Sequence, residues 1–204
     1  LQSEKLNNSN DAIDTLRSVL EDEEGQADAV VLLSELYEKT GKDDDLADLL
    51  ASQIELATSR NDVSTELTLK VRLGAIYETR LRDSARAIET YQAVLERDPS
   101  HKGALLAIAR LFEAKSDWAQ ASASLEKVLV IESGPELVTV ALRLADMYSH
   151  TKDDESLRRV LERAMEIDPS NADVRERLRK LYEKISEWSK LADLLVGDAD
   201  AATA

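Results

Sequence analysis

A helical pattern that recurs about every 34 residues constrains this chain more than any other feature of its sequence. The segment LLSELYEKTGKDDDLADLL, which starts at Leu32, and the segment RLRKLYEKISEWSKLADLL, which starts at Arg177, share LYEK followed by LADLL at the same spacing. Three segments between them follow the same plan with other residues. The 204 residues therefore leave room for about six units of this kind.

Two apolar stripes define the two helices of each unit. In the first, an aliphatic residue precedes an aromatic one by four positions, so both lie on one helical face. The second stripe begins nine or ten residues after the aromatic and predicts a second helix. The first-helix pairs are Leu33 and Tyr37, Leu73 and Tyr77, Ile108 and Phe112, Leu144 and Tyr148, and Leu178 and Tyr182. The second-helix pairs are Ala12 and Leu16, Leu46 and Leu50, Ala87 and Tyr91, Ala121 and Leu125, Leu157 and Leu161, and Leu191 and Leu195.

A small residue follows the first-helix aliphatic residue in four of the five complete units, and would let a neighbouring helix approach closely. These small residues are Ser34, Gly74, Ala109 and Ala145. In the last unit the position is Arg179, which predicts a terminal unit with a more polar exposed face, as the ends of stacked repeats require. Pro99 and Pro169 each predict the end of a second helix, because proline cannot continue a helix.

The pattern resembles the tetratricopeptide repeat family, whose unit of about 34 residues is a helix, a turn and a second helix. Gly74, Tyr77, Ala87 and Pro99 match the small, aromatic, alanine and proline positions of that family. The resemblance covers about residues 10–196. It implies an all-α fold: a right-handed superhelical solenoid of antiparallel helix pairs, about 11 helices in all, with a concave face.

The expected domain organisation is a single array over residues 1–196, followed by a flexible tail over 197–204. The first unit is expected to be only a second helix, and with a chain that opens at Leu1 this suggests a fragment of a longer protein. The expected units are a half repeat at about 10–25 and repeats at about 27–60, 64–100, 101–135, 136–170 and 171–196.

The charge balance disfavours nucleic-acid binding. With 26 basic and 41 acidic residues the net charge is −15, which repels phosphate backbones. Residues 1–66 hold 17 acids and 5 bases, a net of −12, whereas residues 67–204 hold 24 acids and 21 bases, a net of −3. No apolar run is long enough to insert into a membrane. We expect a cytoplasmic protein, although the lack of cysteine fits either redox environment.

The sequence contains no constellation of residues that would support catalysis. Neither GxGxxG nor GxxxxGK[ST] occurs, and only two histidines are present, His101 and His150. His150 lies four residues after Asp146, which we interpret as an exposed pair or a groove contact. Trp118 and Trp188 are predicted to pack under the turn before the second helix. We therefore expect no enzyme activity, no cofactor and no metal site.

The family resemblance implies that a partner lies along the concave face, lined by first-helix residues that are not used in packing. This mapping predicts an acidic N-terminal half and apolar anchors at Val71, Leu106 and Leu142 beside Arg110. The lysine and asparagine set of the family's carboxylate clamp is missing, so binding of chaperone tails is not expected. The full set of predicted partner-binding residues is Val31, Glu35, Glu38, Val71, Ala75, Glu78, Leu106, Arg110, Glu113, Leu142, Asp146, Ser149, Glu176, Lys180 and Glu183.

The sequence thus predicts a non-catalytic scaffold that binds a peptide or a helical segment of a protein partner, whose basic residues would meet the acidic end. Two other readings stay open. One is a regulatory or self-associating segment of a larger enzyme or of a secretion or assembly component, which would include a homo-oligomer. The other is a helical-repeat RNA-binding array, which the acidic composition disfavours.

Overall fold

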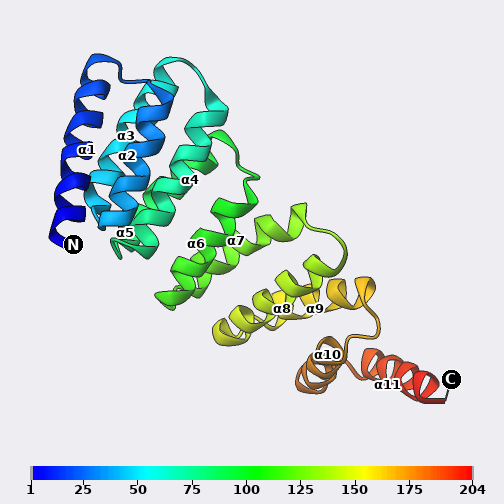
Figure 1. Cartoon of the computed structure of the whole chain (residues 1–204). Coiled ribbons are helices and arrows are strands. Elements are labelled where there is room, and N and C mark those ends of the chain that lie inside the picture. Colours follow the sequence, from blue (N-terminus) through cyan, green and yellow to red (C-terminus); the bar gives the residue numbers. More distant parts are fainter. Residues whose placement is uncertain (1, 204) are drawn as a thin grey trace. The chain divides into compact units, whose positions relative to one another are not determined.

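The computed structural model describes the backbone of residues 2–203 and the side chains of residues 8–197. This part of the chain consists of eleven helices and the turns between them, which confirms the all-α class (Figure 1). The helices are α1 (Gln2–Asp22), α2 (Ala27–Thr40), α3 (Asp43–Ser59), α4 (Val63–Thr79), α5 (Ser84–Arg97), α6 (Lys102–Ala114), α7 (Trp118–Ile131), α8 (Gly134–Thr151), α9 (Asp154–Ile167), α10 (Ala172–Lys184) and α11 (Trp188–Thr203).

The chain forms two compact units, residues 1–104 and residues 105–204, with the boundary inside α6. Consecutive helices from α1 to α5 pack on one another in the first unit, and those from α7 to α11 do so in the second. The last helix extends to Thr203, and so includes most of the segment 197–204 for which the sequence predicted a flexible tail. The prediction of one array over residues 1–196 stays a prediction.

The turn between the two helices of each pair contains one residue in the left-handed backbone conformation, and the N-cap residue of the second helix follows it. The left-handed residues have φ between 56° and 68° and are Gly41, Arg82, Ser116, Lys152 and Ser186. In three of these turns the next residue is an aspartate whose side chain accepts hydrogen bonds from backbone N–H groups at the start of the second helix: Asp83, Asp117 and Asp153. The left-handed residue reverses the chain, and the aspartate satisfies N–H groups that have no partner within the helix.

The repeated apolar positions form the core of both units. The first-helix aliphatic residues are all buried, between 0% and 6% exposed. In the second helices, Leu50, Leu125 and Leu161 are 0% exposed and Tyr91 is 3% exposed. The equivalent residue of the last helix, Leu195, is 46% exposed, because no helix of the described chain covers that face of α11.

Glu66 is a buried charged side chain in α4 of the first unit. Its carboxylate accepts a hydrogen bond of 2.5 Å from Lys70 Nζ, and the guanidinium of Arg97 in α5 lies 3.8 Å away. The hydrogen bond from Lys70 lowers the pKa of Glu66 despite the opposing effect of burial, and the charges of Lys70 and Arg97 lower it further. The ionised form of Glu66 is therefore the one that the fold stabilises.

Replacing Glu66 with Gln should lower the free energy of unfolding at neutral pH. Because the pKa of Glu66 is lower in the folded than in the unfolded chain, its contribution is fully present above the unfolded value of about 4.3 and is lost as the pH falls through the folded value. Urea unfolding of parent and variant across that range should show the difference shrinking toward acid pH. Glu89→Gln, at an exposed position in α5, is the control, and a difference for Glu66→Gln that does not change with pH would contradict this account.

Candidate functional site

Two cavities of the second unit meet at Ser149, near the end of α8. The larger has a volume of about 410 Å³ and lies between α6, the start of α7 and α8. The smaller has a volume of about 280 Å³ and lies between α8, α9 and α10. The larger is lined by Glu113, Trp118, Arg143, Asp146, Met147, Ser149 and His150. The smaller is lined by Ser149, Asp154, Leu157, Leu161, Arg177, Lys180, Leu181 and Lys184.

Ion pairs join neighbouring first helices along these cavities. Arg143 of α8 pairs with Glu113 of α6 at 2.7 Å, and Arg177 of α10 pairs with Asp146 of α8. Arg177 also pairs with Asp173 at 2.9 Å, and hydrogen bonds to both aspartates raise its pKa. Asp146 lines the larger cavity and Arg177 the smaller one, so their ion pair lies between the two.

Trp118 and His150 form a stacked pair in the larger cavity. Their ring centroids lie 4.5 Å apart, with an angle of 9° between the ring planes. The ring of Trp118 thus lies against the end of α8, and the prediction that it packs under the turn before α7 stays a prediction. Asp146 forms an ion pair with Arg177 and not with His150, whereas the alternative expectation of a groove contact for His150, which lines the larger cavity, stays a prediction.

Trp188 occupies the equivalent position at the start of α11 and has a different environment. Its side chain is 62% exposed, so the expectation that Trp188 packs under the turn is wrong. Trp118 is only partly exposed, and its ring stacks on His150 of the following repeat. No further repeat follows α11 within the described residues, so Trp188 has no such neighbour.

The structure brings four of the predicted partner-binding residues to these cavities: Glu113, Asp146, Ser149 and Lys180. The other predicted residues of the second unit lie on the same first helices. Leu106, Leu142 and Glu176 are partly exposed, and Arg110 and Glu183 are exposed.

In the first unit, the predicted residues of α2 are exposed and lie beside basic side chains. Val31 is 56% exposed. Glu35 pairs with Lys39 at 3.3 Å, and Glu38 pairs with Arg72 of α4 at 2.8 Å. This surface is therefore less strongly negative than its sequence alone suggests.

The predicted residues of α4 are less exposed than those of α2. Val71, Ala75 and Glu78 are all partly buried. Glu78 accepts a hydrogen bond from the Tyr91 hydroxyl at 3.4 Å. Glu78 is thus engaged with the neighbouring α5 as well as lying at a predicted groove position.

Several residues that line the cavities were not among the predicted binding residues. Leu157 and Leu161 were assigned to the core from their spacing; Leu161 is fully buried and Leu157 is partly buried, and both line the smaller cavity. No feature of the sequence marked Arg143 as a binding residue. Arg177 belongs to a basic cluster with Arg175, Arg179 and Lys180, which the sequence favours as a solvated face, with contact to an anion or an acidic peptide as the alternative. Lys184 lies four residues after Lys180 on the same helix, and a search for basic residues at helical spacing would have found it.

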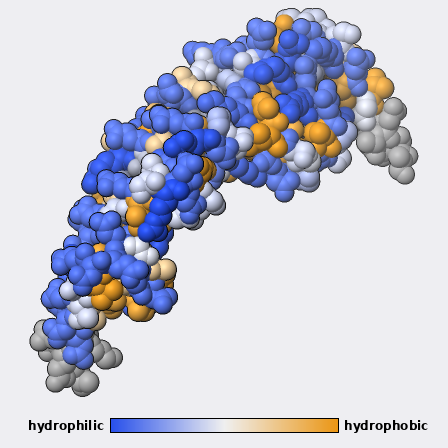
Figure 2. All heavy atoms as spheres, turned by 90° about the horizontal axis from the view of Figure 1, so that it is seen from above, coloured by the Kyte–Doolittle hydropathy of each residue, from blue (hydrophilic) through white to orange (hydrophobic). Residues whose placement is uncertain are grey.

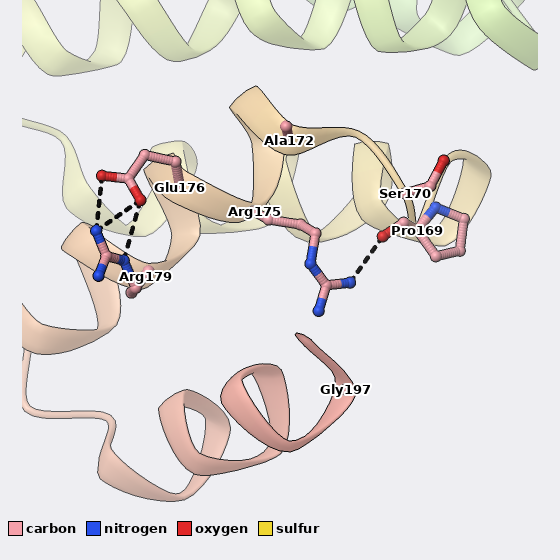
Figure 3. Close-up of a pocket in the computed structure, with 7 residues that line it drawn as sticks. All are labelled: Pro169, Ser170, Ala172, Arg175, Glu176, Arg179 and Gly197. Carbon is pink, nitrogen blue, oxygen red and sulfur yellow. Dashed lines mark hydrogen bonds and ion pairs between the residues drawn. The ribbon is translucent and has the colours of Figure 1, made fainter. Parts of the chain in front are cut away.

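A third cavity, of about 590 Å³, lies at the start of α10, and its charged lining residues already hold the helices together (Figure 3). The Arg175 guanidinium donates to the backbone carbonyl oxygens of Pro169 at 2.7 Å and of Leu194 at 3.1 Å. Arg179 pairs with Glu176 at 2.6 Å. Arg175 thereby connects the turn before α10 with α11, which is a structural role.

On the face drawn in Figure 2, hydrophobic residues form separate patches on a mainly hydrophilic surface. In the described part of the chain, no helix is long and apolar enough to cross a membrane. The same residues include no group of three or more His, Cys, Asp or Glu side chains placed to hold a metal ion.

Two segments of the chain match models of the tetratricopeptide repeat, at residues 29–64 and 74–138. Solved structures of repeat proteins are also similar. A tetratricopeptide repeat protein from Parabacteroides merdae is 17% identical, with a TM-score of 0.52 over 96% of this chain and 77% of that one. The chain therefore carries tetratricopeptide repeats over residues 29–64 and 74–138, and its fold is that of tetratricopeptide repeat proteins.

Two other similar structures extend this comparison. A putative kinesin light chain from Podospora anserina with nearly identical TPR-like repeats is 18% identical, with a TM-score of 0.51 over 86% of this chain and 95% of that one. YrrB, described as a TPR protein with an unusual peptide-binding site, is 15% identical, with a TM-score of 0.50 over 70% of this chain and 71% of that one. At these identities the likeness concerns the fold. No curated protein showed a significant match to the chain.

Proposed function

We propose that this protein is a non-catalytic scaffold that binds a peptide or helical segment of a protein partner through the first helices of its second unit. The observation that carries this proposal is the pair of cavities meeting at Ser149, between α6, α8 and α10. The fold supports it, because repeat arrays of this kind expose first-helix side chains that are not needed for stacking. YrrB, a similar repeat protein, is described as having a peptide-binding site.

The chemistry of the two cavities favours a peptide over a small molecule. The smaller cavity offers leucine side chains, and the larger one offers Met147 and the stacked rings of Trp118 and His150, with ion pairs along both. Successive side chains of a bound segment could occupy the two cavities on either side of Ser149. This is the usual logic of peptide recognition, in which pockets for particular side chains determine specificity.

The first unit offers a surface of different character. Val31 and Leu32 on α2 are 56% and 51% exposed, and the acidic residues Asp28 and Glu35 are exposed on the same helix. We propose that this surface accompanies peptide binding by attracting basic residues of the partner, as the charge of residues 1–66 predicts. High salt should weaken this contribution, since exposed charges are screened.

Replacing Ser149 with Trp should strongly weaken peptide binding, because a large ring at that position would fill the space where the two cavities meet. We would select binders from a random dodecapeptide library displayed on phage, and measure their affinities by fluorescence anisotropy. Ser149→Trp should weaken the selected peptides at least tenfold. Ser189→Trp, at an exposed position on α11 outside both cavities, should change affinity less than twofold.

The proposal fails if the library yields no binder, or if selected peptides bind the Ser149→Trp variant as well as the parent. Circular dichroism and urea unfolding of both variants establish that the fold is intact. A second variant, Leu106→Asp with Arg110→Glu, tests the part of the surface nearer the start of α6. Loss of binding in this variant with retained folding would extend the site along that helix.

A further inference from the structure

The smaller cavity has an apolar floor that suits one large side chain. Leu161 and Leu181 are 0% and 3% exposed, and Leu157 is partly buried. All three line the cavity, two from α9 and one from α10. Its volume of about 280 Å³ lies below the range of about 300–1,000 Å³ that is typical of small-molecule sites. A single Leu, Met or Phe side chain from a partner is therefore the occupant that its size favours.

The rim of this cavity is basic. Arg177, Lys180 and Lys184, all from α10, line it, whereas Asp154 is the one acidic residue among the described residues that do so. The helix that carries them holds five basic and three acidic residues, a net of +2, in a protein whose overall charge is −15. The local charge at this cavity is thus opposite in sign to that of the whole chain.

All three basic residues pair with carboxylates, and two of them, Arg177 and Lys184, are held by close pairs that reach another helix. Arg177 pairs with Asp173 and with Asp146, which occupies its guanidinium on two sides. Lys184 pairs with Asp154 at 2.5 Å, across the gap between α10 and the start of α9. These ion pairs stabilise the rim of the cavity, and they leave Arg177 and Lys184 less available to a ligand carboxylate.

Lys180 is the rim residue best placed to receive an anionic group. It pairs with Glu176 at 3.1 Å, but the same carboxylate pairs more closely with Arg179, at 2.6 Å. The Lys180 side chain is 70% exposed, whereas that of Lys184 is 58% exposed. A ligand carboxylate can therefore replace Glu176 at Lys180 while Glu176 keeps its bond to Arg179.

We propose that this cavity binds a segment in which a large apolar side chain lies next to aspartate or glutamate. The apolar side chain would pack on Leu157, Leu161 and Leu181, and the neighbouring carboxylate would pair with Lys180. This inference rests on the proposed function and names the peptide chemistry for one of its two cavities. The negative charge of the rest of the chain opposes it only weakly, because interactions over more than about 8 Å are screened at physiological ionic strength.

The test uses a fluorescent dodecapeptide, acetylated and amidated at its ends, with a central Phe flanked on each side by Asp and Glu and otherwise composed of Gly and Ser. Affinity is measured by anisotropy at physiological salt. Lys180→Glu should weaken binding at least tenfold, because it reverses the charge that meets the peptide carboxylate. Lys127→Glu, an equal charge change at an exposed position of α7 outside the cavity, should weaken it less than twofold.

Three altered peptides identify what is recognised. Replacing Phe by Ser should cost at least tenfold by removing the apolar anchor, and replacing the four acidic residues by Lys should abolish binding. A peptide that keeps Phe but has only a free terminal carboxylate and no acidic side chain should bind at least tenfold more weakly than the parent peptide. Equal binding of that third peptide would overturn the assignment of internal carboxylates.

The inference is also overturned if the acidic peptide does not bind, or if both charge reversals weaken it equally. If library-selected peptides bind and depend on Ser149 in either case, the proposed function stands and only the chemistry assigned to the smaller cavity is wrong. If neither the library nor the acidic peptide yields binding, both proposals are wrong.

Discussion

Replacing Leu125 with Ala should lower the free energy of unfolding by about 2–5 kcal/mol, the usual range for truncating a fully buried leucine. Leu125 lies in α7, is 0% exposed, and occupies the repeat position at which the second helix contacts its neighbours. The cost includes both the lost burial of the side chain and the cavity left behind. Urea unfolding followed by circular dichroism measures it directly.

Leu195→Ala is the matched control, because it makes the same chemical change at the equivalent position of α11. Leu195 is 46% exposed, and we expect a loss of about 1 kcal/mol or less. Both residues belong to the second unit, and both variants are compared with the parent in the same urea unfolding experiment. Similar losses for the two variants would show that repeat position, and not burial by a following helix, determines the cost.

Replacing Gly74 with Ala should destabilise the first unit, although alanine is intrinsically the better helix former by about 1 kcal/mol. A Cβ atom at residue 74 would lie 2.8 Å from Cε1 and 2.9 Å from Cζ of Tyr91, whose side chain is 3% exposed. The ring would have to move within a packed core, which costs about 1–3 kcal/mol. We expect a net loss of about 1–2 kcal/mol, measured by urea unfolding.

A double variant, Gly74→Ala with Tyr91→Leu, should recover part of that loss. In the second unit, Ala109 and Ala145 stand at the position of Gly74, and leucines stand sixteen residues after them at the position of Tyr91. The double variant should therefore be more stable than the sum of the two single changes predicts, by about 1 kcal/mol or more. Strict additivity would mean that Gly74 and Tyr91 are not coupled.

Gly103→Ala provides the control for helix propensity. Gly103 is an exposed helical glycine of α6, and an added Cβ would meet only His101 side-chain atoms, at 3.3 Å and beyond. We expect a change within about 0.5 kcal/mol. If Gly74→Ala and Gly103→Ala changed the free energy of unfolding by the same amount, the close contact with Tyr91 would not contribute to the cost.

The helical repeat and most of its core were predictable from the residue pattern. The aliphatic rows of the first helices are buried, and Leu50, Leu125 and Leu161 of the second helices are fully buried, as their spacing predicts. The reason is that a period of 3.6 residues places these side chains on one face, which each helix must bury against its neighbours.

The side-chain partners at the candidate site were not predictable in the same way. Pairs such as Glu113 with Arg143 and Asp146 with Arg177 join residues 30 and 31 positions apart, close to one repeat period. Many acidic and basic residues lie at such separations, and only the stacking of neighbouring helices selects among them. Asp146 thus pairs with Arg177, and not with His150, which was one of the two alternatives that the sequence left open for this pair.

The sequence by itself determined the repeat period, the all-α class and the residues that each helix buries, because these depend on local spacing along the helix. The tertiary structure decided which exposed residues share a cavity, and why equivalent residues such as Trp118 and Trp188 differ in exposure. Those properties depend on the helix that lies behind each residue. The spacing of residues along the sequence does not determine these properties, since the same motif is buried where another repeat stacks on it and exposed where none does.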